Sequence, residues 1–165
     1  MSTAKIVFLW PLNKNDLLGK LIQFGEGGTD EPTHVAVVLA DCLLEATAIG
    51  VRKTPLDRYA KRRREIWEIS VLQPELSNIA AIMLEGRKYS YFSCVAGLLR
   101  DKFNIKLPFI NACQDDCSHV GTIWLRCQNL GLFGTDNPAT VTPKDLYLEI
   151  QRWGARCVEK WPIPN

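Results

Sequence analysis

Apolar runs separated by short turns fill the first half of the chain, a pattern that predicts β-strands. Thr33 to Leu39 (THVAVVL) is rich in branched residues, as buried strands are, and Asp41 follows as a tight turn. Arg64 to Leu72 alternates between two faces, which is typical of a strand with one wet face. Strands are therefore expected over residues 5–10, 33–39, 42–47, 50–53 and 64–72, with a short proline-initiated helix over 55–60.

Helical spacing of apolar residues dominates the second half. Helices are expected over residues 16–24, 74–87, 94–103, 117–130 and 143–153, and a last strand near 157–161. Glycine and proline make 25–32 a turn, and 104–116 is expected to be a loop. Strands that cluster first, with helices after them, predict an α+β fold in one domain over residues 1–165.

Composition fits a globular protein and argues against several partners. Of the 165 residues, 47% are hydrophobic and 23% are charged, which is ordinary for a folded domain. The net charge of +2 is too small to favour a nucleic acid or an anionic membrane as partner. No apolar run is long enough to cross a bilayer, so no integral membrane segment is expected. The sequence leaves the oligomeric state open.

The first residues predict where the chain is made. The apolar stretch from Ile6 to Trp10 is too short for the core of a signal peptide, and no small-residue cleavage site follows it. The expected location is the cytoplasm, with a virion or release without a signal as the alternative.

Six cysteines raise the question of disulfides or a reactive thiol. Disulfide frameworks belong to short secreted chains, so free thiols are expected here. Cys117 follows a polar loop and opens an amphipathic helix, where free N–H groups and the helix dipole favour a thiolate. Asp115 or Asp116 is available to cap that helix, although both carboxylates oppose thiolate formation. A buried structural cysteine is the alternative reading of Cys117.

His34 and Glu45 are the candidate partners of this thiol. His34 begins the strand after the glycine-rich turn, and Glu45 lies eleven residues later on the returning strand. A carboxylate flanked by Leu44 and Ala46 is costly without a partner, and an imidazole on the adjacent strand is a natural one. The alternatives are a half-buried histidine bonded to backbone and a solvent-facing glutamate.

The order of several short motifs resembles a known family. Thr33 to Val38, Leu44-Glu45-Ala46, Gly50-Val51, Cys117-Ser118 and Thr142-Pro143-Lys144-Asp145-Leu146 occur in the order found in the YiiX/YebB-like group of circularly permuted NlpC/P60 proteins, over roughly residues 13 to 150. Asp116 stands where relatives usually have an aromatic residue, and His119 stands where they usually have an acidic one.

The resemblance implies a papain-like core with its halves swapped, in which an antiparallel sheet packs against a helix that carries the nucleophile. It implies that Cys117, His34 and Glu45 converge as a nucleophile, a base and the group that orients the base. The expected activity is a thiol hydrolase that needs no metal or cofactor and cleaves an amide or ester of a peptide or acyl substrate. The implied substrate is the stem peptide of peptidoglycan, in a bacterial or phage setting. The alternatives are a lipid acyl hydrolase or acyltransferase, and a catalytically weak binding or phage-assembly module.

Three further features have weaker readings. Cys94 is a rival nucleophile, although its surroundings are typical of a buried helix. Cys113, Cys117, His119 and Cys127 are zinc-ligand types, but their spacing matches no usual zinc pattern. The basic run over residues 61–64 is expected to be a solvated turn, with phosphate or carboxylate binding as the alternative.

Overall fold

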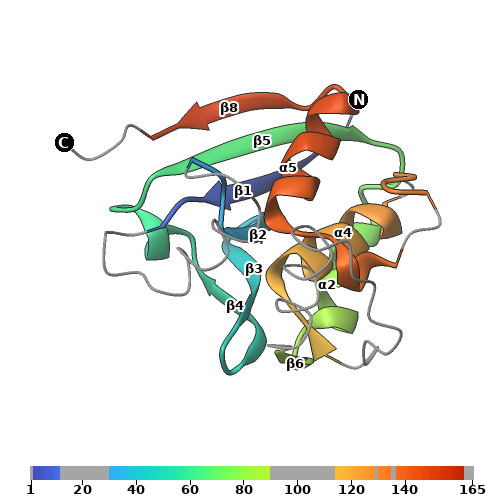
Figure 1. The fold of residues 1–165 in the computed structure, drawn as a ribbon. Helices are drawn as coiled ribbons and strands as arrows, with labels where there is room; N and C mark the ends of the chain where they lie inside the picture. The colour runs from blue at the N-terminus through green and yellow to red at the C-terminus, as the bar shows by residue number, and fades with distance from the viewer. Residues whose placement is uncertain (1, 12–29, 90–113, 129, 135–136, 162–165) are drawn as a thin grey trace.

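A six-stranded antiparallel sheet is the centre of the computed structural model (Figure 1). The structure describes residues 2–11, 30–89, 114–128, 130–134 and 137–161. The strands are β1 (Ser2–Leu9), β2 (His34–Val38), β3 (Cys42–Thr47), β4 (Gly50–Pro55), β5 (Arg64–Val71) and β8 (Arg156–Lys160). They lie side by side in the order β4-β3-β2-β1-β5-β8, so β1 and β2 are central. The α+β class is confirmed, and it is compatible with a papain-like core.

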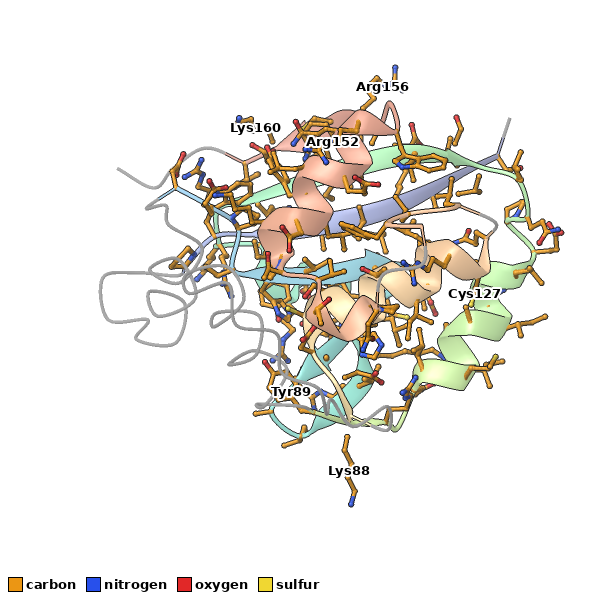
Figure 2. The ribbon with its side chains drawn as sticks, turned by 45° about the vertical axis from the view of Figure 1, so that its right-hand side comes forward. Lys88, Tyr89, Cys127, Arg152, Arg156 and Lys160 are labelled. Atoms are coloured by element: carbon orange, nitrogen blue, oxygen red, sulfur yellow. The ribbon has the colours of Figure 1, made fainter. Side chains whose placement is uncertain are left out.

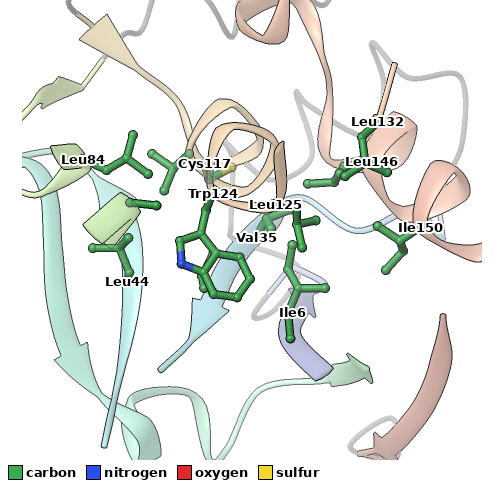
Figure 3. Packing of buried hydrophobic residues seen from close by; sticks show 14 of the residues in the cluster. Ile6, Val35, Leu44, Leu84, Cys117, Trp124, Leu125, Leu132, Leu146 and Ile150 are labelled. Atoms are coloured by element: carbon green, nitrogen blue, oxygen red, sulfur yellow. The ribbon is translucent and has the colours of Figure 1, made fainter. Parts of the chain in front are cut away.

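Among the described residues, three helices cover one face of this sheet. They are α2 (Leu76–Leu84), α4 (Cys117–Cys127) and α5 (Pro143–Arg152). Alternation along β1 turns Ile6 and Phe8 toward the helices, where they join the main apolar cluster with Trp124 and Leu146 (Figure 3). We call this the helix face of the sheet. At Gly121 the helix α4 comes so close that an added Cβ would lie 3.0–3.2 Å from three core side chains.

The opposite face of the sheet has a smaller apolar cluster. Val7 and Leu9 of β1 meet Ala36 of β2 and Leu43 of β3 there. Tyr59 packs against this cluster from η1 (Leu56–Tyr59), a short 3-10 helix after β4. We call this the Tyr59 face. Because β1 and β2 bury both of their faces, their sequences are continuous apolar runs.

Most predicted elements are present within a few residues of the expected bounds, and one expectation is wrong. Residues 114–115, expected as loop, form the strand β7 (Gln114–Asp115), which pairs in parallel with β6 (Lys88–Tyr89). The helices expected over 16–24 and 94–103 lie outside the described residues. The edge strand β8 presents Arg156 and Lys160 at the rim of the sheet (Figure 2), where charged side chains discourage pairing with another chain.

The helix α5 begins as its sequence predicts. Thr142 caps it, and Asp145 returns a bond to the Thr142 N–H, so the two form a capping box around Pro143. The T-P-x-D-L motif therefore has a structural explanation in this chain.

Three arginines of the basic run over 61–64 bond to distant parts of the chain. Arg62 donates to the Trp10 carbonyl, Arg63 pairs with Asp30, and Arg64 bonds Glu159 of β8 at 2.8 Å. The predicted turn before β5 is present, but these three arginines are half-buried and paired with other groups of the chain instead of solvated.

Candidate active site

His34 and Glu45 meet on the Tyr59 face of the sheet. His34 is the first residue of β2, and Glu45 lies on β3, which pairs with β2 through Val37 and Leu44. The His34 Nε2 atom is 2.7 Å from Glu45 Oε2, a charge-assisted hydrogen bond. The predicted pairing of these two side chains is thus present. Nδ1 of His34 is left as the nitrogen able to take a proton.

The Glu45 carboxylate is fully buried and fully partnered. Its side chain is 0% exposed. Oε2 accepts from His34 and from the Tyr59 hydroxyl at 2.5 Å, and Oε1 accepts from the Thr54 hydroxyl at 2.7 Å and faces Arg58 Nε at 3.2 Å. Burial by itself raises the pKa of Glu45, but the bonds from His34, Tyr59 and Thr54 outweigh it and lower the pKa to about 2. Glu45 is therefore an anion held in one orientation.

Tyr59 closes this network from η1. Burial and the adjacent Glu45 carboxylate raise the pKa of Tyr59 to about 12, so its hydroxyl stays a donor. Its ring stands edge-on to His34, with centroids 5.9 Å apart. The sequence reasoning missed Tyr59, Thr54 and Arg58. The proline at 55 predicted a short helix that contains Tyr59, but no local sequence pattern connects Tyr59 to Glu45.

Cys117 lies where the sequence predicts in the chain, at the first position of α4. Asp116 caps the helix by accepting from His119 N–H at 2.8 Å. The Cys117 side chain is 5% exposed and belongs to the main apolar cluster (Figure 3). The helix N-terminus favours a thiolate there, whereas burial opposes charge on the sulfur. Asp116 itself is an unusual neighbour, because burial raises its pKa to about 6.

Cys117 and the His34–Glu45 pair lie on opposite faces of the sheet. His34 alternates with Val35, which packs under α4 on the helix face, whereas Ala36 lies on the Tyr59 face. The pair therefore shares the face of Ala36, and Cys117 shares the face of Val35. The structure brings together two of the three predicted residues on one face and puts the third on the other.

The pair and the thiol nevertheless lie toward the same end of the sheet. Val51, which follows the β3–β4 turn, donates to the Arg87 carbonyl at 2.8 Å, just before β6. β6 pairs with β7, and β7 leads directly into Cys117. In an antiparallel sheet the end of β3 lies beside the start of β2, where His34 is located.

The His119 ring lies against the carboxylate of Asp115. Its Nδ1 is 2.8 Å from Asp115 Oδ1, and Arg87 Nε is 2.7 Å from Asp115 Oδ2. The His119–Asp115 contact has the length of an ion pair, but its angles are not those of a hydrogen bond. The residue that departs from the family pattern therefore lies against a buried carboxylate at the helix start, and Arg87 supplies the positive charge beside that carboxylate.

The remaining candidates are placed as follows. Cys94 and Cys113 lie outside the described residues, and Cys42, Cys117, Cys127 and Cys157 are not joined in disulfide bonds. Within the described ranges, no group of three histidine, cysteine or acidic side chains is arranged to hold a metal ion. No helix in those same ranges has the length and apolar character needed to span a membrane.

The sequence was compared with protein families and with curated proteins. No family model matches it, and no curated protein shows significant similarity.

Proposed function

We propose that the protein is a thiol hydrolase that cleaves an amide or ester bond, with Cys117 as nucleophile, His34 as base and Glu45 as the group that orients the base. The observation that carries the proposal is the 2.7 Å bond between His34 Nε2 and a Glu45 carboxylate with a pKa near 2. A charged acceptor that fixes one ring nitrogen leaves the other free for proton transfer and stabilises the imidazolium that forms.

The proposed reaction proceeds through a thioester. His34 Nδ1 takes the Cys117 proton, and the sulfur attacks the carbonyl carbon. The backbone N–H of Cys117 and a second donor hold the oxyanion, and His34 then protonates the leaving amine or alcohol. Water hydrolyses the thioester, with His34 as base, to release the acid and the free thiol.

This reaction requires the thiol and the ring to meet. Because they lie on opposite faces, the reactive state requires the His34 ring or the first turn of α4 to move around the start of β2. His34 is 17% exposed and begins β2, so only the backbone of Thr33, which donates to the Leu9 carbonyl, continues the pairing beyond its ring. Peptidoglycan stem peptides are the first proposed substrates, on the strength of the resemblance, and acyl lipids are the alternative.

A binding or assembly module without catalysis is the second candidate. The position of Cys117 among apolar side chains, 5% exposed, favours it. In that reading the His34–Glu45–Tyr59 network stabilises the fold and Cys117 fills a space in the core.

Acylation by p-nitrophenyl acetate distinguishes the two candidates. The hydrolase predicts an acetyl adduct on Cys117, mapped by mass spectrometry, that is absent in Cys117→Ser and forms at least about tenfold more slowly in His34→Ala. The matched control is Cys157→Ser, which removes a half-buried thiol from β8 and leaves the adduct unchanged. Equal labelling of several cysteines, or none on Cys117, contradicts the proposal and supports the binding module.

A further inference from the structure

Arg52 of β4 is a cation without an acceptor beside the candidate site. The strand register places Arg52 directly opposite Glu45, so both side chains are on the Tyr59 face. The Arg52 Nε atom is buried and has no hydrogen-bond partner in the part of the chain that the structure describes. A guanidinium does not lose its charge in proteins, and a buried donor without an acceptor costs stability. The Arg52 Nε donor is therefore poised for an acceptor that the described residues do not provide.

Glu45 does not fill that role, although it is the neighbour across the strand. Three hydrogen-bond donors, together with the ion pair to Arg58, already occupy both of its oxygens. Arg58, which is 37% exposed, supplies the positive charge next to Glu45. Arg52 lies across the strand from this pair but forms no ion pair with a carboxylate of the described residues, so its positive charge is not compensated by them.

We propose that Arg52 binds a carboxylate group of the substrate, in a subsite one strand beyond Glu45. The planar guanidinium fork matches a carboxylate with two parallel hydrogen bonds. A single excess positive charge fits a monoanion better than a phosphate, which carries more charge and more acceptor oxygens. The ligand is a substrate only if the proposed hydrolase function holds, whereas the subsite itself is a property of Arg52.

The spacing of the strands indicates which part of the substrate the carboxylate belongs to. Neighbouring strands are about 4.8 Å apart, so β4 is about 10 Å from β2, which carries His34. An extended peptide rises about 3.3 Å per residue. In the reactive state, in which Cys117 meets His34, the carboxylate therefore belongs to an acidic side chain or a chain end about two or three residues from the bond that is cleaved.

The subsite is tested by titrating the protein with sodium acetate while following the Nε–Hε NMR signal of Arg52, identified by its loss in Arg52→Gln. The ionic strength is held constant with chloride. Acetate is expected to shift this signal to saturation, chloride is not, and phosphate is expected to bind more weakly than acetate. Arg52→Lys, which keeps the charge but loses the fork, is expected to weaken acetate binding at least tenfold, measured on the neighbouring backbone signals.

Lys53→Gln is the matched control, because Lys53 is the next residue on β4, points to the other face and pairs with Glu85. It is expected to bind acetate as the wild type does. No saturation, an equal response to chloride, or tighter binding of phosphate overturns the proposal. The titration is repeated in Cys117→Ser, where the same saturation is expected. A failed acylation experiment with an intact acetate response then removes the hydrolase and leaves the carboxylate site.

Discussion

Replacing Glu45 with glutamine tests the network at the centre of the site. Glutamine keeps the size of the side chain but removes the charge and turns one acceptor oxygen into a donor NH2. Each oxygen of Glu45 faces two donors, so the new NH2 group opposes either His34 and Tyr59 or Thr54 and Arg58.

The lowered pKa of Glu45 sets the size of the effect. A pKa of about 2, against an ordinary value of 4.5, is a shift of about 2.5 units, which at about 1.4 kcal/mol per unit corresponds to about 3 kcal/mol. Because the folded protein favours the ionised form, this stabilisation is present above pH 4.5 and is lost as the pH falls toward 2. Glu45→Gln is therefore expected to lose about 3 kcal/mol near pH 7, with a smaller loss near pH 3.

Urea unfolding of both proteins at several pH values measures this difference. Glu85→Gln is the matched control, because Glu85 is 42% exposed and its pair with Lys53 is expected to contribute less than about 1 kcal/mol. A Glu45→Gln loss that is the same near pH 3 as near pH 7, or no larger than that of Glu85→Gln, would refute the reasoning.

Three other substitutions follow from the same structure. Asp116→Asn keeps a helix cap but removes a carboxylate whose pKa burial raises to about 6, and such a group costs stability as the pH rises through 6. The variant is therefore expected to gain about 1–2 kcal/mol of unfolding free energy near pH 7, measured by urea unfolding. Asp116→Ala also loses the helix cap and is expected to gain less. Gly121→Ala is expected to cost about 1–3 kcal/mol in the same assay, because its Cβ would lie 3.0 Å from Leu146 Cδ2; no loss would contradict the close packing of α4. Tyr59→Phe removes the 2.5 Å bond to Glu45 and is expected to raise the pKa of Glu45, seen in the carboxyl carbon NMR titration; an unchanged titration would remove Tyr59 from the network.

Local patterns were enough to predict the elements that carry the candidate residues. The branched run after Thr33 and the turn at Asp41 predict β2 and β3. The acidic pair before Cys117 and the proline at 143 predict the starts of the two helices that follow them. The pairing of His34 with Glu45 could also be predicted. Glu45 is the one charged residue on its strand, and the adjacent antiparallel strand offers His34 as a partner. These features depend on residues close together in the sequence.

The parts that were missed depend on contacts between distant segments. β6 and β7 are two residues each, too short to have a pattern of their own, and their paired residues are 26 positions apart in the sequence. The sequence also did not show which face of the sheet α4 packs against. The central strand β1 is apolar on both faces, with Ile6 and Phe8 on one and Val7 and Leu9 on the other. Alternation therefore identified the residues that share a face, but it did not show which face receives Cys117.

The most direct test of the account is the rate at which iodoacetamide alkylates each cysteine as a function of pH, in the wild type and in His34→Ala. The proposed hydrolase predicts that Cys117 reacts fastest, well below the ordinary thiol pKa of about 8.5, and that His34→Ala removes this advantage. If Cys117 reacts no faster than Cys42, Cys127 and Cys157, or reacts equally fast without His34, the catalytic pairing is contradicted.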